Sequence, residues 1–179
     1  MGRITDDSRA PEPPSSRAPE LPSRKAVIAV GSNLGDRRAA VAFAAERLVA
    51  ILTDASLSEL IETEPEGEGL EDQPLYLNAV IVGDTALAPR DLLDRLLAIE
   101  NAFGRERPFA GAPRTLDLDL VLLGEEVVDE PGLQVPHPRF RERFFVLGPL
   151  AQVAPDVRDP VTGLRAGELL RNLLRDGAR

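Results

Sequence analysis

The stretch "PRTLDLDLVLLG", residues 113–124, decides the fold because it joins two strand patterns in one short segment. Its first half alternates polar and apolar residues, and its second half is continuously aliphatic. Residues two apart on a strand share a face, so the alternation places Asp117 and Asp119 side by side and turns the leucines between them the other way. The segment therefore predicts a strand that is anchored in the core by leucines and has two carboxylates on its opposite face.

The rest of the chain predicts an α+β domain around this strand. Short apolar runs rich in β-branched residues predict further strands at residues 25–32, 55–65 and 75–85, and a hairpin at 125–135. Apolar residues at helical spacing predict helices at residues 36–52, 89–104, 140–153 and 165–174. The order strand, helix, strand, strand, helix, strand is the split βαβ pattern of ferredoxin-like domains. We therefore expect an antiparallel sheet with helices packed on one side of it.

Two residues mark the starts of the first two expected helices. Asp36 is positioned to cap the first helix, and Pro89 suits the first position of the second. The motif "GSNLGD", residues 31–36, is a strand-to-helix turn of the kind that binds phosphate in other proteins. No lysine follows Lys25, so a lysine-dependent P-loop is excluded. We expect a tight turn in which Asn33 or Asp36 caps the helix.

Length and composition limit the class of protein. With 179 residues, 43% of them hydrophobic, the chain has room for one substantial core, and we expect one domain at residues 25–179. It has no cysteine, which excludes disulfides, thiolate metal sites and a cysteine nucleophile. The formal net charge of -9 argues against nucleic acid or an anionic membrane as a partner. The sequence has neither an apolar run of membrane-spanning length nor a secretory signal, so we expect a soluble cytoplasmic protein. We also expect it to be a monomer.

The first 24 residues differ in composition from the rest of the chain. They are rich in Pro, Ser and charged residues, and the motif "SRAPE" occurs twice, at residues 8–12 and 16–20. Such a segment buries too little apolar surface to offset its chain entropy. We expect residues 1–24 to be a disordered tail without a role in stability or chemistry.

The paired acids lie close in sequence to clustered arginines. Arg105, Arg107 and Arg114 belong to the loop that runs directly into Asp117 and Asp119. Magnesium takes oxygen ligands from one or two carboxylates and from phosphates, while guanidinium groups bind further phosphate oxygens. The combination favours a polyphosphate site with bound magnesium. The alternatives are a solvent-facing row of acids, or acids and arginines that pair with each other on the surface.

A second basic cluster follows the only histidine. His137 lies between two prolines, and Arg139, Arg141 and Arg143 come shortly after it. A lone histidine is usually structural or simply exposed, but here the arginines place it in a basic segment. A serine-histidine-acid triad remains open, although no G-x-S-x-G motif supports it. The acidic loop at residues 64–73 is long enough to indicate a function of its own.

Four segments together resemble one known family. They are "GSNLGD", "DQPLYLNAV", "GAPRTLDLDLVLLG" and "VPHPRFRERFFVLGPL", which are similar to the 6-hydroxymethyl-7,8-dihydropterin pyrophosphokinases of folate biosynthesis. The similarity runs in order from about Ala26 to about Leu170. It implies a ferredoxin-like fold and transfer of the pyrophosphoryl group of ATP to the hydroxymethyl group of the pterin, with release of AMP. Two Mg²⁺ ions are implied as cofactors and ATP as the co-substrate.

The resemblance also implies roles for individual residues. Asp117 and Asp119 match the pair that binds both magnesium ions, and they share the catalytic positions with Arg105, Arg107 and Arg114. The residues that match ATP contacts are Glu100, Arg105, Arg114, His137 and Arg143. The residues that match the pterin pocket are Thr63, Pro65, Tyr76, Asn78 and Phe145, of which the two aromatics are expected to flank the flat ring.

The sequence departs from the family pattern in two loops. Gly111 and Ala112 stand where the family usually has Trp-Gly before Pro-Arg, and Glu66 stands where the pterin loop is usually apolar. Two other functions therefore stay open. One is a non-catalytic ferredoxin-like module that binds pterin or nucleotide, and the other is a magnesium-dependent phosphohydrolase that uses the same acids.

Overall fold

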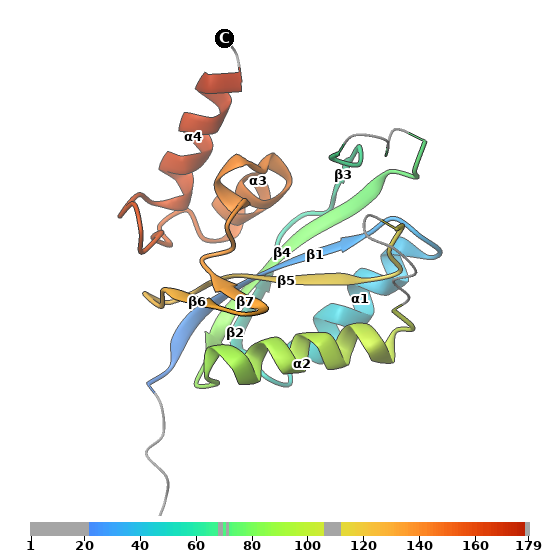
Figure 1. Ribbon diagram of the computed structural model, residues 1–179, viewed down its shortest axis with the longest axis horizontal. Coiled ribbons are helices and arrows are strands. Elements are labelled where there is room, and N and C mark those ends of the chain that lie inside the picture. The colour runs from blue at the N-terminus through green and yellow to red at the C-terminus, as the bar shows by residue number, and fades with distance from the viewer. Residues whose placement is uncertain (1–21, 68–69, 71, 106–111, 178–179) are drawn as a thin grey trace, which may run out of the picture.

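The central strand of the sheet is β1 (Arg24–Ser32), which pairs antiparallel with β4 (Tyr76–Thr85) on one side and β5 (Asp117–Leu123) on the other. Two shorter strands, β2 (Thr53–Leu57) and β3 (Ile61–Thr63), pair antiparallel with the outer edge of β4. The resulting strand order is β2-β4-β1-β5 (Figure 1). The helix after β1 therefore leads to β2, and the helix after β4 leads to β5, each two positions away in the sheet. This is the ferredoxin-like arrangement, and the predicted fold class is confirmed. The structure is a computed structural model, and it describes residues 22–67, 70, 72–105 and 112–177.

The first two helices cover one face of the sheet, as predicted. α1 (Arg37–Leu48) and α2 (Pro89–Ala102) pack on a core that includes Leu118 and Leu120 of β5, so the predicted direction of these leucines is confirmed. Asp36 caps α1, because its Oδ1 accepts a hydrogen bond from the backbone N–H of Ala39 at 3.0 Å. The proline expected at the first helical position is the first residue of α2. α1 ends earlier than predicted, and a turn follows it.

The opposite face of the sheet is covered as well. α3 (Phe144–Val153) and α4 (Ala166–Gly177) lie on that side of the sheet in Figure 1. Their core includes Val27 of β1 and Val80 of β4, both fully buried. The expectation of helices on one side only is therefore wrong. The physical reason is that β1 and β4 are apolar on both faces, and such strands need a covering layer on each.

Two predicted elements are divided in the structure. The strand predicted at residues 55–65 forms β2 and β3, because the Oγ of Ser58 replaces a backbone carbonyl and accepts a hydrogen bond from the Val80 N–H at 2.9 Å. The helix predicted at residues 140–153 forms a short 3-10 helix, η1 (Phe140–Glu142), and then α3, because Arg143 between them is extended. The predicted hairpin is confirmed as β6 (Val128–Glu130) and β7 (Leu133–Val135).

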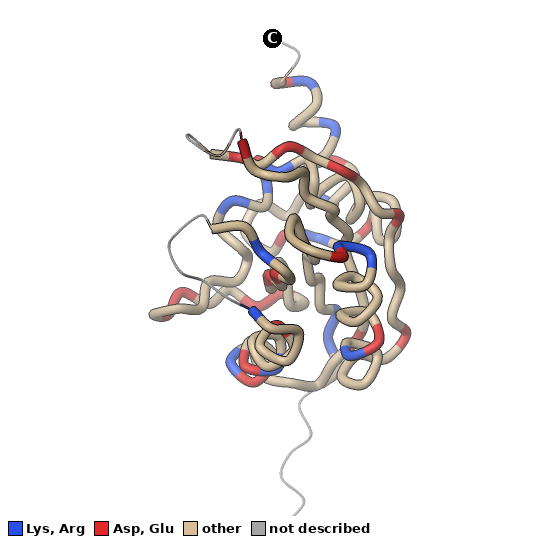
Figure 2. The backbone as a smooth tube through the Cα atoms, turned by 90° about the vertical axis from the view of Figure 1, so that its right-hand side faces the viewer, with Lys and Arg blue, Asp and Glu red and all other residues tan. Residues whose placement is uncertain are grey.

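Acidic and basic residues are mixed along the described chain. In the view of Figure 2, Lys and Arg positions are interspersed with Asp and Glu positions on several elements.

Among the described residues, no helix has both the length and the apolar character needed to cross a membrane.

The ordered sheet begins one residue before the predicted boundary. Residues 1–21 of the predicted tail lie outside the described residues, but Arg24 is already part of β1. Its guanidinium pairs with Glu126 and donates a hydrogen bond to the carbonyl oxygen of Leu87 at 2.9 Å, and its side chain is only 14% exposed. Arg24 therefore connects the start of the sheet to two distant loops.

We predict that Arg24→Ala lowers the free energy of unfolding by about 1–2 kcal/mol, because it removes a hydrogen bond and an ion pair from a largely buried position. Removal of residues 1–21 should leave the urea unfolding midpoint unchanged. Urea titration of both proteins against the full chain measures the two effects. Equal midpoints for Arg24→Ala and the full chain would contradict the role given to Arg24.

Candidate active site

The strand register brings the paired acids next to residues of two other strands. Asp117 lies opposite Gly31 of β1, and Gly31 lies opposite Asn78 of β4, so the three residues form one row across the sheet. Asp119 occupies the next row, opposite Ala29. A Cβ atom at Gly31 would lie 3.1 Å from the Oδ1 of Asn78, so the glycine keeps the space beside that amide open. The row faces the side of the sheet where α3 begins.

The "GSNLGD" turn fixes the segment that leads into β5. The backbone N–H groups of Asn33 and Leu34 donate to the carbonyl oxygen of Arg114 at 3.0 and 3.2 Å. The Oδ1 of Asn33 accepts a hydrogen bond from the Arg114 N–H at 2.7 Å, and the Oγ of Ser32 donates to the Thr115 carbonyl at 2.7 Å. Of the two expected caps, Asp36 caps the helix, whereas Asn33 holds the backbone of Arg114. Sequence reasoning missed this positioning role because it depends on a contact between distant segments.

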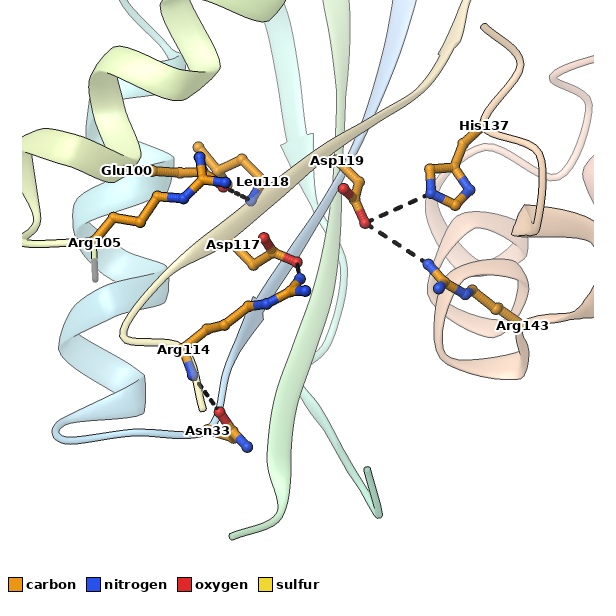
Figure 3. Close-up of polar contacts among 9 residues, drawn as sticks. All are labelled: Asn33, Glu100, Arg105, Arg114, Asp117, Leu118, Asp119, His137 and Arg143. Carbon is orange, nitrogen blue, oxygen red and sulfur yellow. Dashed lines mark hydrogen bonds and ion pairs between the residues drawn. The ribbon is translucent and has the colours of Figure 1, made fainter. Parts of the chain in front are cut away.

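The two acids have different basic partners, as Figure 3 shows. Asp117 pairs with Arg114, three residues earlier in the chain. The Oδ2 of Asp119 lies 3.7 Å from an Nη atom of Arg143 and 3.9 Å from the Nε2 of His137, both from the C-terminal part of the chain. The backbone N–H of His137 donates a hydrogen bond to the carbonyl oxygen of Val121 in β5 at 2.9 Å, which holds the histidine near the strand. Two basic groups from one segment therefore face one carboxylate.

The electrostatic setting favours a bound cation at the acid pair. Burial and, after it, the neighbouring Asp117 carboxylate raise the pKa of Asp119 above its ordinary value, although His137 and Arg143 act the other way. Burial lowers the pKa of His137 despite the attraction of Asp119. The Nδ1 of His137 accepts a hydrogen bond from the Arg139 N–H at 3.2 Å, so a neutral ring has its proton on Nε2. Two repelling carboxylates are stabilised by a cation between them.

The acids alone make an incomplete metal site. Across the described ranges, no group of three or more His, Cys, Asp or Glu side chains is arranged to hold a metal ion. Mg²⁺ commonly binds through one or two carboxylates and takes its remaining ligands from substrate phosphates and water. The donor set of Asp117 and Asp119 therefore fits magnesium that arrives with a phosphate ligand.

Glu100 and Arg105 lie on the other side of β5 from His137 and Arg143 (Figure 3). Glu100 is buried, with 1% exposure, and its Oε1 accepts a hydrogen bond from the Leu118 N–H at 2.7 Å. Its carboxylate also pairs with Arg105. Leu118 is the residue between the two acids, so Glu100 connects the first arginine of the loop to the backbone of the acid pair.

One cavity of about 350 Å³ gathers most of the predicted site residues, and we call it the acid-pair cavity. The predicted residues that line it are Thr63, Tyr76, Asn78, Arg114, Asp117, Asp119, His137, Arg143 and Phe145. Pro65, Glu100 and Arg105 are not among its lining residues. Arg107 lies outside the described residues.

Sequence reasoning did not assign every residue of this cavity. Glu66, which was noted only as a departure from the family, and Arg139 both line it. Arg141 points elsewhere: its guanidinium forms two hydrogen bonds of 2.7 Å with the fully buried Asp159. The basic cluster after His137 is therefore divided between the cavity and the core, which residue spacing alone does not predict.

A second cavity, of about 640 Å³, lies between β5, α2 and the β6–β7 hairpin, and we call it the hairpin cavity. Its wall includes Leu93, Leu120 and Gln134. Asp119 and His137 line both cavities, so the two spaces meet at the second acid of the pair. Fold and site together define a ferredoxin-like α+β protein with two adjoining cavities at a pair of carboxylates.

Comparisons with known proteins identify the family. Residues 27–155 match the family described as 7,8-dihydro-6-hydroxymethylpterin-pyrophosphokinase (HPPK). A 2-amino-4-hydroxy-6-hydroxymethyldihydropteridine pyrophosphokinase of Pseudomonas aeruginosa is 44% identical over 155 residues, which cover 82% of this chain and 90% of that protein. A protein of the same name from Bacillus subtilis is 43% identical over 141 residues, which cover 76% of this chain and 82% of that protein. The chain therefore belongs to the HPPK family.

A solved structure supports the fold. The crystal structure of Plasmodium falciparum HPPK-DHPS wild type with pteroate matches with a TM-score of 0.66 and 15% identity, over 87% of this chain and 43% of that one. At this identity the likeness concerns the fold alone, and this chain spans less than half of that protein.

The predicted enzyme class is confirmed by family membership. The chain is a pyrophosphokinase of folate biosynthesis, which uses ATP as co-substrate and 6-hydroxymethyl-7,8-dihydropterin as acceptor. The alternatives of a non-catalytic binding module and a phosphohydrolase find no support in these relatives.

The hydrogen bonds between Asn33 and the backbone of Arg114, which we call the Asn33 clamp, lead to a stability prediction. Asn33 is 1% exposed, and Asn33→Ala removes the acceptor of the Arg114 N–H. We expect a loss of about 1–3 kcal/mol in the free energy of unfolding, because a donor becomes unsatisfied. Leu34→Ala, at a neighbour that is 45% exposed, is the control and should unfold nearly like the original chain. Equal urea midpoints for the two variants would rule out the clamp.

The repulsion between the acids leads to a second prediction, for Asp119→Asn in the absence of divalent cations. Because the pKa of Asp119 is raised in the folded state, its contribution to stability is present at low pH and is lost as the pH rises through that pKa. The variant avoids this loss, so at pH 7 its melting temperature should equal or exceed that of the original chain. A variant that melts clearly lower at pH 7 in EDTA would contradict this account.

Proposed function

We propose that the pterin binds in the acid-pair cavity and ATP in the hairpin cavity, with the triphosphate directed toward Asp119 and His137. The observation that supports this arrangement is that these two residues line both cavities. Pyrophosphoryl transfer requires the pterin hydroxymethyl oxygen and the β-phosphorus of ATP to approach each other in line. Adjoining cavities that share an acid meet this requirement.

The pterin lies between Tyr76 and Phe145 in this proposal. Flat aromatic side chains provide a large contact area for a flat ring at a small cost in rotamer entropy. The Nδ2 of Asn78 donates a hydrogen bond to the Oγ1 of Thr63 at 2.8 Å, which orients the amide. Its Oδ1 then faces the space beside Gly31 and accepts a hydrogen bond from an N–H of the pterin. Pro65 follows in the same segment but does not line the cavity, so its place in the pterin pocket rests on the family resemblance alone.

The acid pair and the basic side chains around it would together bind the phosphates. Asp117 and Asp119 would hold two Mg²⁺ ions, which supply neutralisation of the triphosphate charge when bound. Arg114 and Arg143 donate to phosphate oxygens from either side of the acid pair. His137, whose pKa is lowered by burial, donates a hydrogen bond from its Nε2–H to a phosphate oxygen and stays uncharged.

The remaining predicted residues act from the loop and from behind the strand. We assign Arg105 and Arg107 to stabilising the transferred group, where two positive charges offset the charge that develops on it. Glu100 acts indirectly in this proposal: it holds Arg105 and the Leu118 N–H, and so fixes the starting position of the loop relative to the acids. We further propose that the chain is a monomer in the cytoplasm.

One assay tests the reaction directly. Purified protein with Mg²⁺ and ATP should form AMP only when 6-hydroxymethyl-7,8-dihydropterin is present. Release of phosphate without the pterin would indicate a phosphohydrolase, and binding without AMP would indicate a non-catalytic module. Both outcomes would overturn the proposed reaction.

Loss of either acid should stop the reaction but not the folding of the chain. We predict that Asp117→Ala and Asp119→Ala each lower turnover at least about a hundredfold, equivalent to roughly 2.7 kcal/mol of barrier. Asp84→Ala is the matched control, because Asp84 lies on β4 and pairs with Lys25 away from both cavities. Near-normal turnover of either acid variant, with circular dichroism unchanged, would rule out the magnesium assignment.

A further inference from the structure

Glu66 places a third carboxylate beside the basic groups of the acid-pair cavity. It lies shortly after β3, in the segment that also contributes Thr63 to the cavity wall. Its Oε2 is 3.8 Å from an Nη atom of Arg139 and 3.9 Å from the Nε of Arg143. Its side chain is 43% exposed, so it reaches the arginines from the open side of the cavity. Glu66 therefore faces Arg143, which the proposed function assigns to phosphate, and its neighbour Arg139.

Arg143 lies between two carboxylates without a short contact to either. Its Nε faces Glu66 at 3.9 Å and an Nη atom faces Asp119 at 3.7 Å, both longer than a hydrogen bond. Among the described residues, the buried Nε atom of Arg143 has no hydrogen-bond partner. The side chain itself is only 18% exposed. The guanidinium is thus oriented by charge attraction and by the Phe145 ring, whose centroid lies 5.3 Å from its Cζ, while its Nε stays available for a closer acceptor.

We propose that Glu66 competes with the triphosphate of ATP for Arg143 and so lowers the affinity of the protein for the nucleotide. The inference rests on the proposed function, because it takes Arg143 as a phosphate ligand. A phosphate oxygen at normal hydrogen-bond distance binds a guanidinium more strongly than a carboxylate nearly 4 Å away, so the substrate displaces Glu66. The binding free energy of the phosphates is reduced in two ways: Glu66 loses its attraction to the arginines, and its charge repels the incoming phosphates.

The sign of this effect distinguishes it from a purely structural role. If Glu66 served to orient Arg139 and Arg143, its removal would weaken nucleotide binding. If Glu66 competes, neutralising it strengthens binding. Because the effect is electrostatic and the carboxylate is partly exposed, added salt reduces it.

The test compares Glu66→Gln with the original chain by calorimetric titration of Mg²⁺ and a non-hydrolysable ATP analogue, without pterin. We expect Glu66→Gln to bind the analogue about two- to fivefold more tightly at low salt, a range typical for loss of a partly exposed charge contact. The gain should shrink at about 0.5 M salt, where the screening length is only a few ångströms. Glu62→Gln is the matched control, because Glu62 is in β3, pairs with Arg37 at 2.6 Å and does not line the cavity. The affinity of this variant for the ATP analogue should stay unchanged.

The outcomes separate this inference from the proposed function. Equal or weaker binding by Glu66→Gln, in a variant with an unchanged melting temperature, would overturn the inference and leave the proposed function standing. A gain that is the same in low and high salt would overturn it too, because it would then not be a charge effect. No binding of the analogue by the original chain would overturn the proposed function and the inference with it.

Discussion

The pairing of β5 with β1 is the constraint on which the site depends. Its register sets Asp117 opposite Gly31 and Asp119 opposite Ala29, while Leu118 and Leu120 fill the core on the other face. A slip of one residue would exchange the two faces, which would turn the two carboxylates into the apolar core under α1 and α2 and the leucines toward the acid-pair cavity. Hydrophobic burial of the leucines therefore fixes the positions of the acids.

The second layer of helices completes the site as well as the core. Because the sheet is apolar on both faces at β1 and β4, the C-terminal helices pack on the side to which the acids point. The start of α3 then delivers Arg143 and Phe145 to the acid-pair cavity. The cavity walls come from the segment after β3, from β5 and from this helix start, so it forms only when the whole domain has folded.

Local patterns were enough to predict the fold class and the direction of the β5 side chains, because strand alternation is a property of adjacent residues. The resemblance to a family predicted nine residues that the structure gathers in one cavity. Adjacent residues did not predict the division of the strand at Ser58, the clamp at Asn33 or the contact of Arg141 with Asp159. Each of these depends on a partner that is distant in sequence. The loop containing Arg107, and with it Gly111, lies outside the described residues, so its predicted role stays a prediction.

The most direct measurement is a crystal structure of the protein with Mg²⁺, a non-hydrolysable ATP analogue and 6-hydroxymethylpterin. We expect the pterin ring between Tyr76 and Phe145, the nucleoside in the hairpin cavity, and magnesium bound by Asp117 and Asp119 between them. A triphosphate bound away from the acid pair, or acids that remain paired only with Arg114 and Arg143 while both substrates are bound, would contradict this arrangement.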